Sequence, residues 1–350
     1  MSVRAMQRIL VADVGGTNCR MGSFRLEGTS LALERSARIS SANLESGQDL
    51  FLALSQGLDL RPEEAGAVVI GLAGPVDGQK GSLTNGRLRV DLAAVPSLAG
   101  TGRCLLLNDF MLQAYAILTP PGAQASYVAG PEQKKGEDAI FPGKEPAGRV
   151  KNTCVRKTHA VVGAGTGLGA ASLLLTDQGV PLAVPSEAGH VAFAFLDKEE
   201  QDYGRALCKG LGRAFASAEN VLCGRGLSTL HYYLTGQMLH PSQAGDSALS
   251  RDTPTLRWYA RFLGRFCQEW ILSSLCREGL WIAGGVAAAN PLCVSCPSFS
   301  EALYAGAGDV VSLLQSVPVR LVTDTDSGLW GGAYAGLALC GIELADIENA

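Results

Sequence analysis

The chain has 350 residues, of which 47% are hydrophobic and 18% charged, and its formal net charge at pH 7 is −4. This length suits one large or two medium globular domains. The acidic balance and the absence of a recognition motif argue against nucleic-acid binding. The first residues lack a signal sequence and no apolar run is long enough for a membrane span, so we expect a cytoplasmic protein without a membrane partner.

The first third of the chain alternates between predicted strands and helices. Residues 8 to 26 hold two apolar runs separated by a Gly-Gly-Thr turn, which predicts two strands, with a third near 32 to 39. Strands joined through helices predict a mostly parallel α/β sheet. The other elements expected here are a helix at 44 to 58, strands at 65 to 74 and 102 to 110, and a helix at 110 to 118.

A similar pattern restarts after a polar segment. Residues 130 to 157 are rich in Lys, Gly and Pro, and their acidic residues favour an exposed loop over a basic binding patch. A glycine turn between two apolar runs then recurs at 158 to 175, which indicates a weak internal repeat. Later elements are helices from 205 to 275, a strand and glycine turn at 279 to 290, and a strand and small-residue helix at 318 to 339.

Each half thus places a glycine turn inside a hairpin, where bare backbone N–H groups can approach an anion. Gly15, Gly16 and Thr17 follow Asp13, an acid in an apolar strand that suits Mg²⁺ held through water. The turn at 163 to 169 fits a dinucleotide fingerprint only in part, because that fingerprint opens a helix and a strand is expected here. Two such hairpins favour a nucleotide clamped between related domains, and a plain hairpin is the alternative for each.

Other glycine patterns narrow the choice of nucleotide site. No Walker-type sequence is present, which excludes that class of NTPase. A third turn holds Gly284 and Gly285 after another strand. Its small residues suit close approach of a flat ring, and tight packing explains them equally well.

Polar residues that suit catalysis follow one of the buried strands. Asn108 and Asp109 stand at its C-terminal end, where ligands bind in open α/β sheets. Asp109 there is placed either to accept a proton from an attacking hydroxyl or to cap the next helix.

A second polar cluster contains Glu187 and His190, spaced so that both side chains can point to one spot. A carboxylate and an imidazole suit paired sugar hydroxyls, and a capped turn is the alternative. A zinc site is less favoured because no third ligand is near. Glu219 lies in a helical stretch, where a solvated face would explain it.

Taken together in chain order, these motifs make the sequence resemble bacterial glucokinases of the hexokinase–actin superfamily. The matching stretches are "DVGGTNCR" at 13 to 20, "GPV" at 74 to 76, "LTN" at 83 to 85, "LNDF" at 107 to 110, "GAGTGLG" at 163 to 169, "SEAGH" at 186 to 190, "SAENVLCGRGL" at 217 to 227 and "AGGV" at 283 to 286. The resemblance implies two related α/β domains of the actin/hexokinase (ribonuclease H-like) type, with an active-site cleft between them. It implies a small domain of residues 1–118, with 336–350 packing back onto it, and a large domain of residues 119–335.

The resemblance also implies ATP-dependent phosphorylation of glucose to glucose 6-phosphate, with Asp109 as the general base. Mg²⁺ would accompany ATP, held by Asp13 through water, and no structural zinc is expected. The residues implied to bind the sugar are Asn85, Asn108, Asp109, Glu187, His190 and Glu219. The residues implied to surround ATP and its phosphates are Asp13, Gly15, Gly16, Thr17, Asn18, Gly165, Thr166, Gly167, Gly284 and Gly285.

The sequence also departs from the family pattern. The 130–157 insertion is longer than usual, and Leu88 stands where an aromatic residue is expected, which affects the finer contacts of the sugar pocket. The zinc-binding cysteine cluster of the related ROK kinases is absent, which favours the non-ROK branch. Cys293 and Cys296 form the one close cysteine pair, and we interpret them as structural or incidental thiols, with a metal or redox role as the less favoured alternative.

Two alternative functions and the oligomeric state stay open at this level. A kinase of another hexose or an N-acetylhexosamine would keep Asp109 and change only the pocket. A sugar-responsive regulator would need a DNA-reading module, for which the strand beginning at Arg8 leaves no room. A homodimer is one option for assembly.

Overall fold

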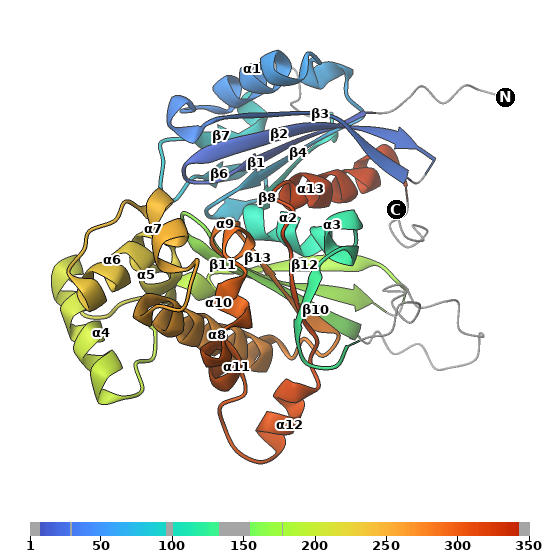
Figure 1. The fold of residues 1–350 in the computed structure, drawn as a ribbon. Helices are drawn as coiled ribbons and strands as arrows, with labels where there is room; N and C mark the ends of the chain where they lie inside the picture. Colours follow the sequence, from blue (N-terminus) through green and yellow to red (C-terminus); the bar gives the residue numbers. More distant parts are fainter. Residues whose placement is uncertain (1–7, 29, 96–100, 133–154, 177, 343–350) are drawn as a thin grey trace, which may run out of the picture.

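The computed structural model describes residues 8–28, 30–95, 101–132, 155–176 and 178–342. Two bodies, each built on a twisted sheet, lie one above the other (Figure 1). The upper sheet has the strand order β3-β2-β1-β4-β8, and the lower sheet has the order β12-β11-β10-β13-β14-β9. The α/β class with two related sheets is therefore confirmed.

The upper body, which we call the small body, begins with the predicted hairpin. β1 pairs antiparallel with β2 and parallel with β4, and β4 pairs parallel with β8. Helix α1 contributes Leu50 and Leu54 to the core on one face of this sheet. Its elements are β1 (Arg8–Val14), β2 (Asn18–Glu27), β3 (Ser30–Ser40), α1 (Gly47–Leu58), β4 (Ala67–Leu72), β5 (Val76–Asp77), β6 (Lys80–Ser82), β7 (Arg89–Asp91) and β8 (Cys104–Asn108).

The lower or large body repeats this arrangement. β10 pairs antiparallel with β11 and parallel with β13, as β1 does with β2 and β4. Its strands are β9 (Ser126–Ala129), β10 (Val155–Ala164), β11 (Leu168–Thr176), β12 (Pro181–Ser186), β13 (Gly279–Ala283) and β14 (Val319–Leu321). Its helices are α4 (Lys198–Leu211), α5 (Ala218–Leu222), α6 (Gly224–Thr235), α7 (Pro241–Ala248), α8 (Pro254–Ser274), α9 (Gly285–Ala289), α10 (Leu292–Ser295), α11 (Pro297–Leu303) and α12 (Asp309–Gln315).

Helices α2 (Asp109–Ala116) and α13 (Ser327–Leu337), with the short α3 (Pro120–Ala123), lie between the two sheets (Figure 1). Small residues let them pack closely, because a side chain at Gly331 would collide with the Leu112 carbonyl of α2. One hydrophobic cluster joins both helices to residues of both sheets, including Val11 and Val161. The two bodies therefore share part of their core, while the domain division near residue 118 stays a prediction.

A buried ion pair fastens α4 to α8 in the large body. The Glu200 carboxylate is 1% exposed and the Arg265 guanidinium 8%, and their two contacts measure 2.7 and 3.0 Å. Arg265 also donates to the Ala194 carbonyl, and Glu200 accepts from the Leu196 amide. The pair thus anchors the chain segment that follows His190.

The polar insertion and Leu88 are the two departures from the family pattern. Residues 133–154 of the predicted loop lie outside the described residues, and Val155 onward already belongs to β10. Leu88, where an aromatic residue was expected, is fully buried in the core of the small body.

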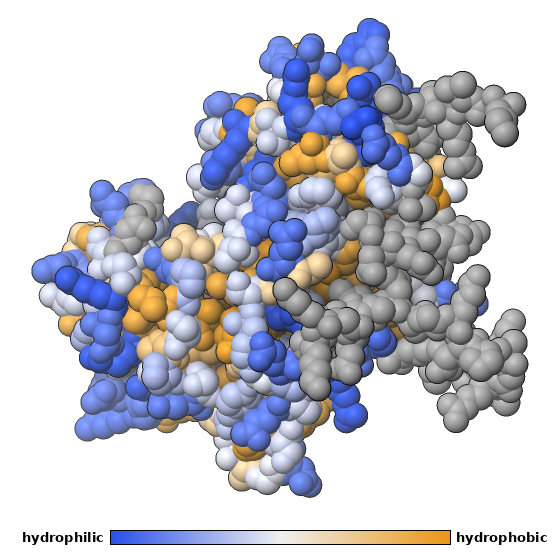
Figure 2. All heavy atoms as spheres, turned by 45° about the vertical axis from the view of Figure 1, so that its right-hand side comes forward, coloured by the Kyte–Doolittle hydropathy of each residue, from blue (hydrophilic) through white to orange (hydrophobic). Residues whose placement is uncertain are grey.

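Figure 2 shows hydrophilic side chains over the outer rims of both bodies, with hydrophobic atoms reaching the surface between them. Within the part of the chain that is described, no helix has the length and apolar character needed to cross a membrane.

Candidate active site

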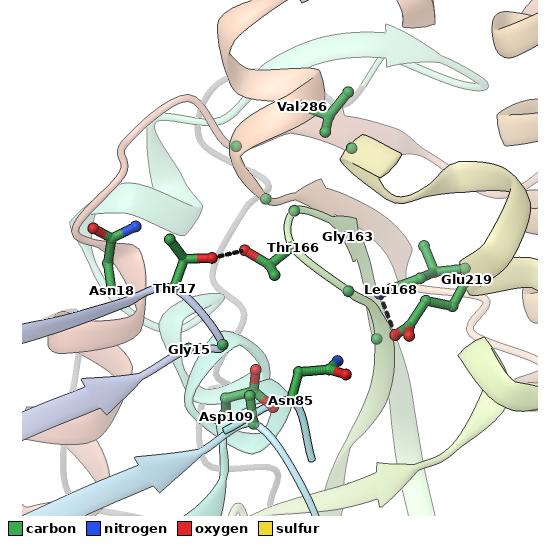
Figure 3. Close-up of a pocket in the computed structure, with 18 of the residues that line it drawn as sticks. Gly15, Thr17, Asn18, Asn85, Asp109, Gly163, Thr166, Leu168, Glu219 and Val286 are labelled. Carbon is green, nitrogen blue, oxygen red and sulfur yellow. Dashed lines mark hydrogen bonds between the residues drawn. The ribbon is translucent and has the colours of Figure 1, made fainter. Parts of the chain in front are cut away.

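A pocket of about 760 Å³ lies between the two bodies, lined by residues from both. All sixteen residues that the sequence analysis assigned to ATP, sugar or catalysis line it, although they come from distant parts of the chain. The close-up in Figure 3 shows Thr17 facing Thr166, and Asp109 near Asn85. The structure therefore brings the predicted residues together in one place, while their individual roles stay predictions.

The first glycine turn joins β1 to β2 at one wall of the pocket. The Gly15 amide donates to the Asn18 carbonyl at 2.9 Å, and the Ser41 hydroxyl donates to the Gly15 carbonyl at 2.7 Å. Asp13, at 6% exposure, lies opposite Arg20 in the strand register, with 3.5 Å between its carboxylate and the guanidinium. Burial raises the pKa of Asp13, and Arg20 opposes this shift.

The second glycine turn joins β10 to β11, and backbone hydrogen bonds hold it in place. The Gly165 amide donates to the Gly167 carbonyl at 2.8 Å, and the Gly224 amide donates to the Gly165 carbonyl at 2.9 Å. A strand, β11, follows the turn, so the dinucleotide-fingerprint reading is correctly set aside. The Thr166 and Thr17 hydroxyls lie 2.9 Å apart, so the two glycine turns meet across the pocket (Figure 3).

Asp109 lies where β8 ends and α2 begins. The helix cap is Asn108, whose Oδ1 accepts from the Phe110 amide at 2.9 Å and whose Nδ2 donates to the Gly74 carbonyl at 3.3 Å. Asn108 is therefore the main cap of helix α2. A role as helix cap, the alternative considered for Asp109 in the sequence analysis, is not needed to explain this residue. Burial, reinforced by the Asp13 and Glu187 carboxylates, raises the pKa of Asp109 to about 7, and the Phe110 amide opposes this. A carboxylate with this pKa is suited to take up a proton at neutral pH.

Phe110 joins helix α2 to the second hairpin, a contact that the sequence analysis missed. A Cβ at Gly163 would lie 3.2 Å from its ring, and a Cβ at Gly169 would collide with it. These two glycines face each other in the β10–β11 register. The first and last glycines of "GAGTGLG" therefore accommodate Phe110 of α2, which holds Asp109 in place relative to the turn.

Glu187 and His190 lie at the two ends of a single turn of 3₁₀ helix, Ala188–His190. The His190 imidazole and the Glu187 carboxylate are 3.5 Å apart, and both side chains are about half exposed. The Ser186 hydroxyl accepts from the Ala188 amide and shapes this turn. Accessible polar atoms of both donor and acceptor type therefore face the pocket beside Asp109.

The other end of the pocket contains residues that the sequence analysis did not assign to the site. It is lined from α6, α7 and α9, beyond Gly284 and Gly285. Asn290 is held there by a 2.9 Å bond from its Nδ2 to the Val286 carbonyl. Arg225 and Val286 lie in matched stretches of the sequence, and the other residues of this end come together only through tertiary packing. The residues that line it are Arg225, His240, Pro241, Gly245, Val286, Ala289 and Asn290.

The donor set suits a hydrated Mg²⁺ rather than a metal caged by protein. Among the described residues there is no group of three His, Cys, Asp or Glu side chains that could hold a metal ion. Asp13 offers carboxylate oxygens beside the first turn, so most other ligands would be water and phosphate oxygens. Mg²⁺ commonly binds in this way. The nine described cysteines are all free thiols.

Comparison with known proteins gives one consistent family. The sequence model of the Glucokinase family matches residues 10–338. A glucokinase of Psychromonas ingrahamii is 30% identical over 336 residues, covering 93% of this chain and 96% of its own. The glucokinase of Balamuthia mandrillaris in complex with glucose has a similar fold, with a TM-score of 0.76, 20% identity and coverage of 98% and 96%. A ROK family glucokinase from Streptomyces griseus, in complex with glucose and AMPPNP, has a TM-score of 0.60 at 16% identity, with coverage of 94% and 98%.

Proposed function

The chain belongs to the Glucokinase family, and we infer that it transfers the terminal phosphoryl group of ATP to the 6-hydroxyl of glucose in the pocket described above. One observation carries the assignment of the site. Asp109, with a pKa of about 7, lies in one pocket with two glycine turns and with the Glu187–His190 pair. This arrangement joins a proton acceptor to a phosphate site and a hydroxyl site.

In the proposed reaction, Asp109 accepts the proton of the sugar hydroxyl as its oxygen attacks the terminal phosphorus of ATP. The new O–P bond forms while the bond to the ADP oxygen breaks, so ADP leaves with the electron pair. The Gly15 and Gly165 amides close their own turns, and the other backbone N–H groups of these turns, at 16–17 and 166–167, would bind the phosphates. Bound Mg²⁺, held near Asp13 through water, would offset the negative charge of the phosphates.

We assign the sugar contacts to the polar side chains on the Asp109 side of the pocket. Glu187, His190 and Glu219 offer acceptors and a donor from the large body, and Asn85 and Asn108 face them from the small body. The Asn108 side chain already bonds the Phe110 amide and Gly74 carbonyl, so it has little spare capacity. The end beyond Gly284 and Gly285 would take the nucleoside part of ATP.

One chain supplies every residue that we assign to the reaction. We propose that the enzyme works in the cytoplasm, where its ATP is available and its cysteines stay reduced. The free state of the nine described cysteines supports this location.

A coupled assay of ADP formation tests the function, using purified protein, ATP, Mg²⁺ and a panel of hexoses and N-acetylhexosamines. We expect glucose to be the best acceptor, and Asp109→Asn to lower kcat by about 10²–10⁴-fold while largely keeping glucose affinity. The matched control is Asp59→Asn, an exposed position whose φ of 53° suits asparagine. A wild-type protein inactive toward glucose would refute the function, and an Asp109→Asn variant with most of its kcat would refute the base.

A further inference from the structure

Glu219 contacts the second glycine turn directly. Its Oε2 accepts a hydrogen bond from the Leu168 amide at 3.0 Å, which Figure 3 shows. The carboxylate also lies against the turn itself, because a Cβ at Gly167 would be 2.6 Å from the same oxygen. Glu219 therefore helps to determine where residues 165–168 lie.

Two further contacts confine the same end of the turn. A side chain at Gly189 would collide with the Leu168 carbonyl, so the 3₁₀ turn that carries His190 packs tightly against this peptide. On the other side, the Gly224 amide donates to the Gly165 carbonyl, and Gly224 begins α6, two positions after α5 ends. The end of the proposed phosphate turn is thus enclosed by the segments that carry the proposed sugar-binding side chains.

The Glu219 carboxylate can serve two partners at once. Oε2 is engaged with Leu168, and the described residues provide no other hydrogen-bond donor to this carboxylate. The side chain is partly exposed and lines the pocket. Because a carboxylate has two oxygens with spare lone pairs, Oε1 can accept from a sugar hydroxyl while Oε2 keeps the turn in place.

We propose that Glu219 is a positioning residue that couples the sugar site to the phosphate turn. This inference rests on the proposed function and adds a regulatory role within the same pocket. A sugar hydroxyl on Oε1 restricts the carboxylate, and the carboxylate in turn restricts Leu168 and the 165–167 turn. Glucose then raises the affinity for ATP, and by reciprocity ATP raises the affinity for glucose by the same factor.

Calorimetric titration with Mg²⁺ and AMPPNP, a nonhydrolysable ATP analogue, tests this coupling with and without saturating glucose. For the wild type we expect glucose to tighten AMPPNP binding by about 5–150-fold. For Glu219→Ala we expect the factor to fall to about one, and sugar-free AMPPNP affinity to fall about fivefold, the effect of one hydrogen bond. Glu219→Gln keeps an oxygen for the Leu168 amide, so its sugar-free AMPPNP affinity should stay within about twofold of the wild type.

Glu187→Gln is the matched control, because Glu187 faces the sugar site without a hydrogen bond to the turn. It should weaken glucose binding and keep the wild-type coupling factor once glucose saturates. The inference is overturned if the wild type shows no coupling, or if Glu219→Ala loses glucose affinity and retains coupling. Either result, in a protein that turns over glucose, leaves the proposed function intact, whereas a wild type that binds neither ligand overturns both.

Discussion

The raised pKa of Asp109 predicts that the reaction slows on acidification already below pH 7. A carboxylate must be ionised to accept a proton, and the pKa of Asp109 is about 7 because of burial and the nearby Asp13 and Glu187 carboxylates. With this value, about one tenth of the enzyme is ionised at pH 6 and about one hundredth at pH 5. We therefore expect kcat/KM for glucose to fall about tenfold for each pH unit below 7.

The measurement is kcat/KM for glucose between pH 5 and 9, with product followed directly so that no coupling enzyme limits the rate. Glu187→Gln removes one of the charges that raise the pKa, so its acid limb should move to lower pH. Carbon NMR of labelled aspartate should show one carboxyl that titrates near pH 7 and is missing in Asp109→Asn. A profile that stays flat down to pH 5, with no such carboxyl, would refute the reasoning.

The same pKa has a consequence for stability, with a definite sign. The pKa of Asp109 is higher in the folded protein than its ordinary value of 3.8, so burial penalises the ionised form of the folded state. This penalty begins above pH 4 and is complete above about pH 7. Asp109→Asn should therefore raise the melting temperature more at pH 8 than at pH 5.

Four substitutions have further expected results. Asp13→Asn should lower kcat/KM for ATP and raise the Mg²⁺ requirement, with near-normal glucose affinity by calorimetry; lost glucose affinity at unchanged ATP kinetics would contradict this. Glu187→Gln and His190→Ala should each weaken glucose binding by about 1–3 kcal/mol, the cost of unpaired polar groups, and unchanged affinity in both would show that they are structural. Glu200→Ala leaves Arg265 buried without its partner and should lower the free energy of unfolding by about 3–5 kcal/mol in denaturant titration. A loss under about 1 kcal/mol would contradict that reasoning.

The parts of the site that the sequence predicted are those with a local signal. Asp13 and the Gly-Gly-Thr turn stand out because an acid and glycines interrupt an apolar strand. Asn108 and Asp109 stand out because they end a buried run. The hairpins at both turns were likewise predicted, since each lies between two apolar runs adjacent in the chain.

The parts that were missed depend on contacts between distant segments. The ring of Phe110 rests on Gly163 and Gly169, and only the folded protein shows that these glycines serve an aromatic ring. Asn290 lines the same end of the pocket as residues more than forty positions earlier, such as Gly245. The hydrogen bond from Leu168 to Glu219 spans 51 positions, so the helical spacing around Glu219 does not indicate it.

The hydrophobic cluster around α2 and α13 also bears on how the chain folds. Residues of the small-body sheet such as Ile9 and of the large-body sheet such as Trp281 belong to the same cluster. A fragment containing only one sheet would expose its share of this apolar surface to water, at a large cost in free energy. The two halves repeat one architecture, and each has a hydrophobic cluster of its own besides the shared one. Unfolding of either body should therefore destabilise the other, because it exposes the cluster that they share.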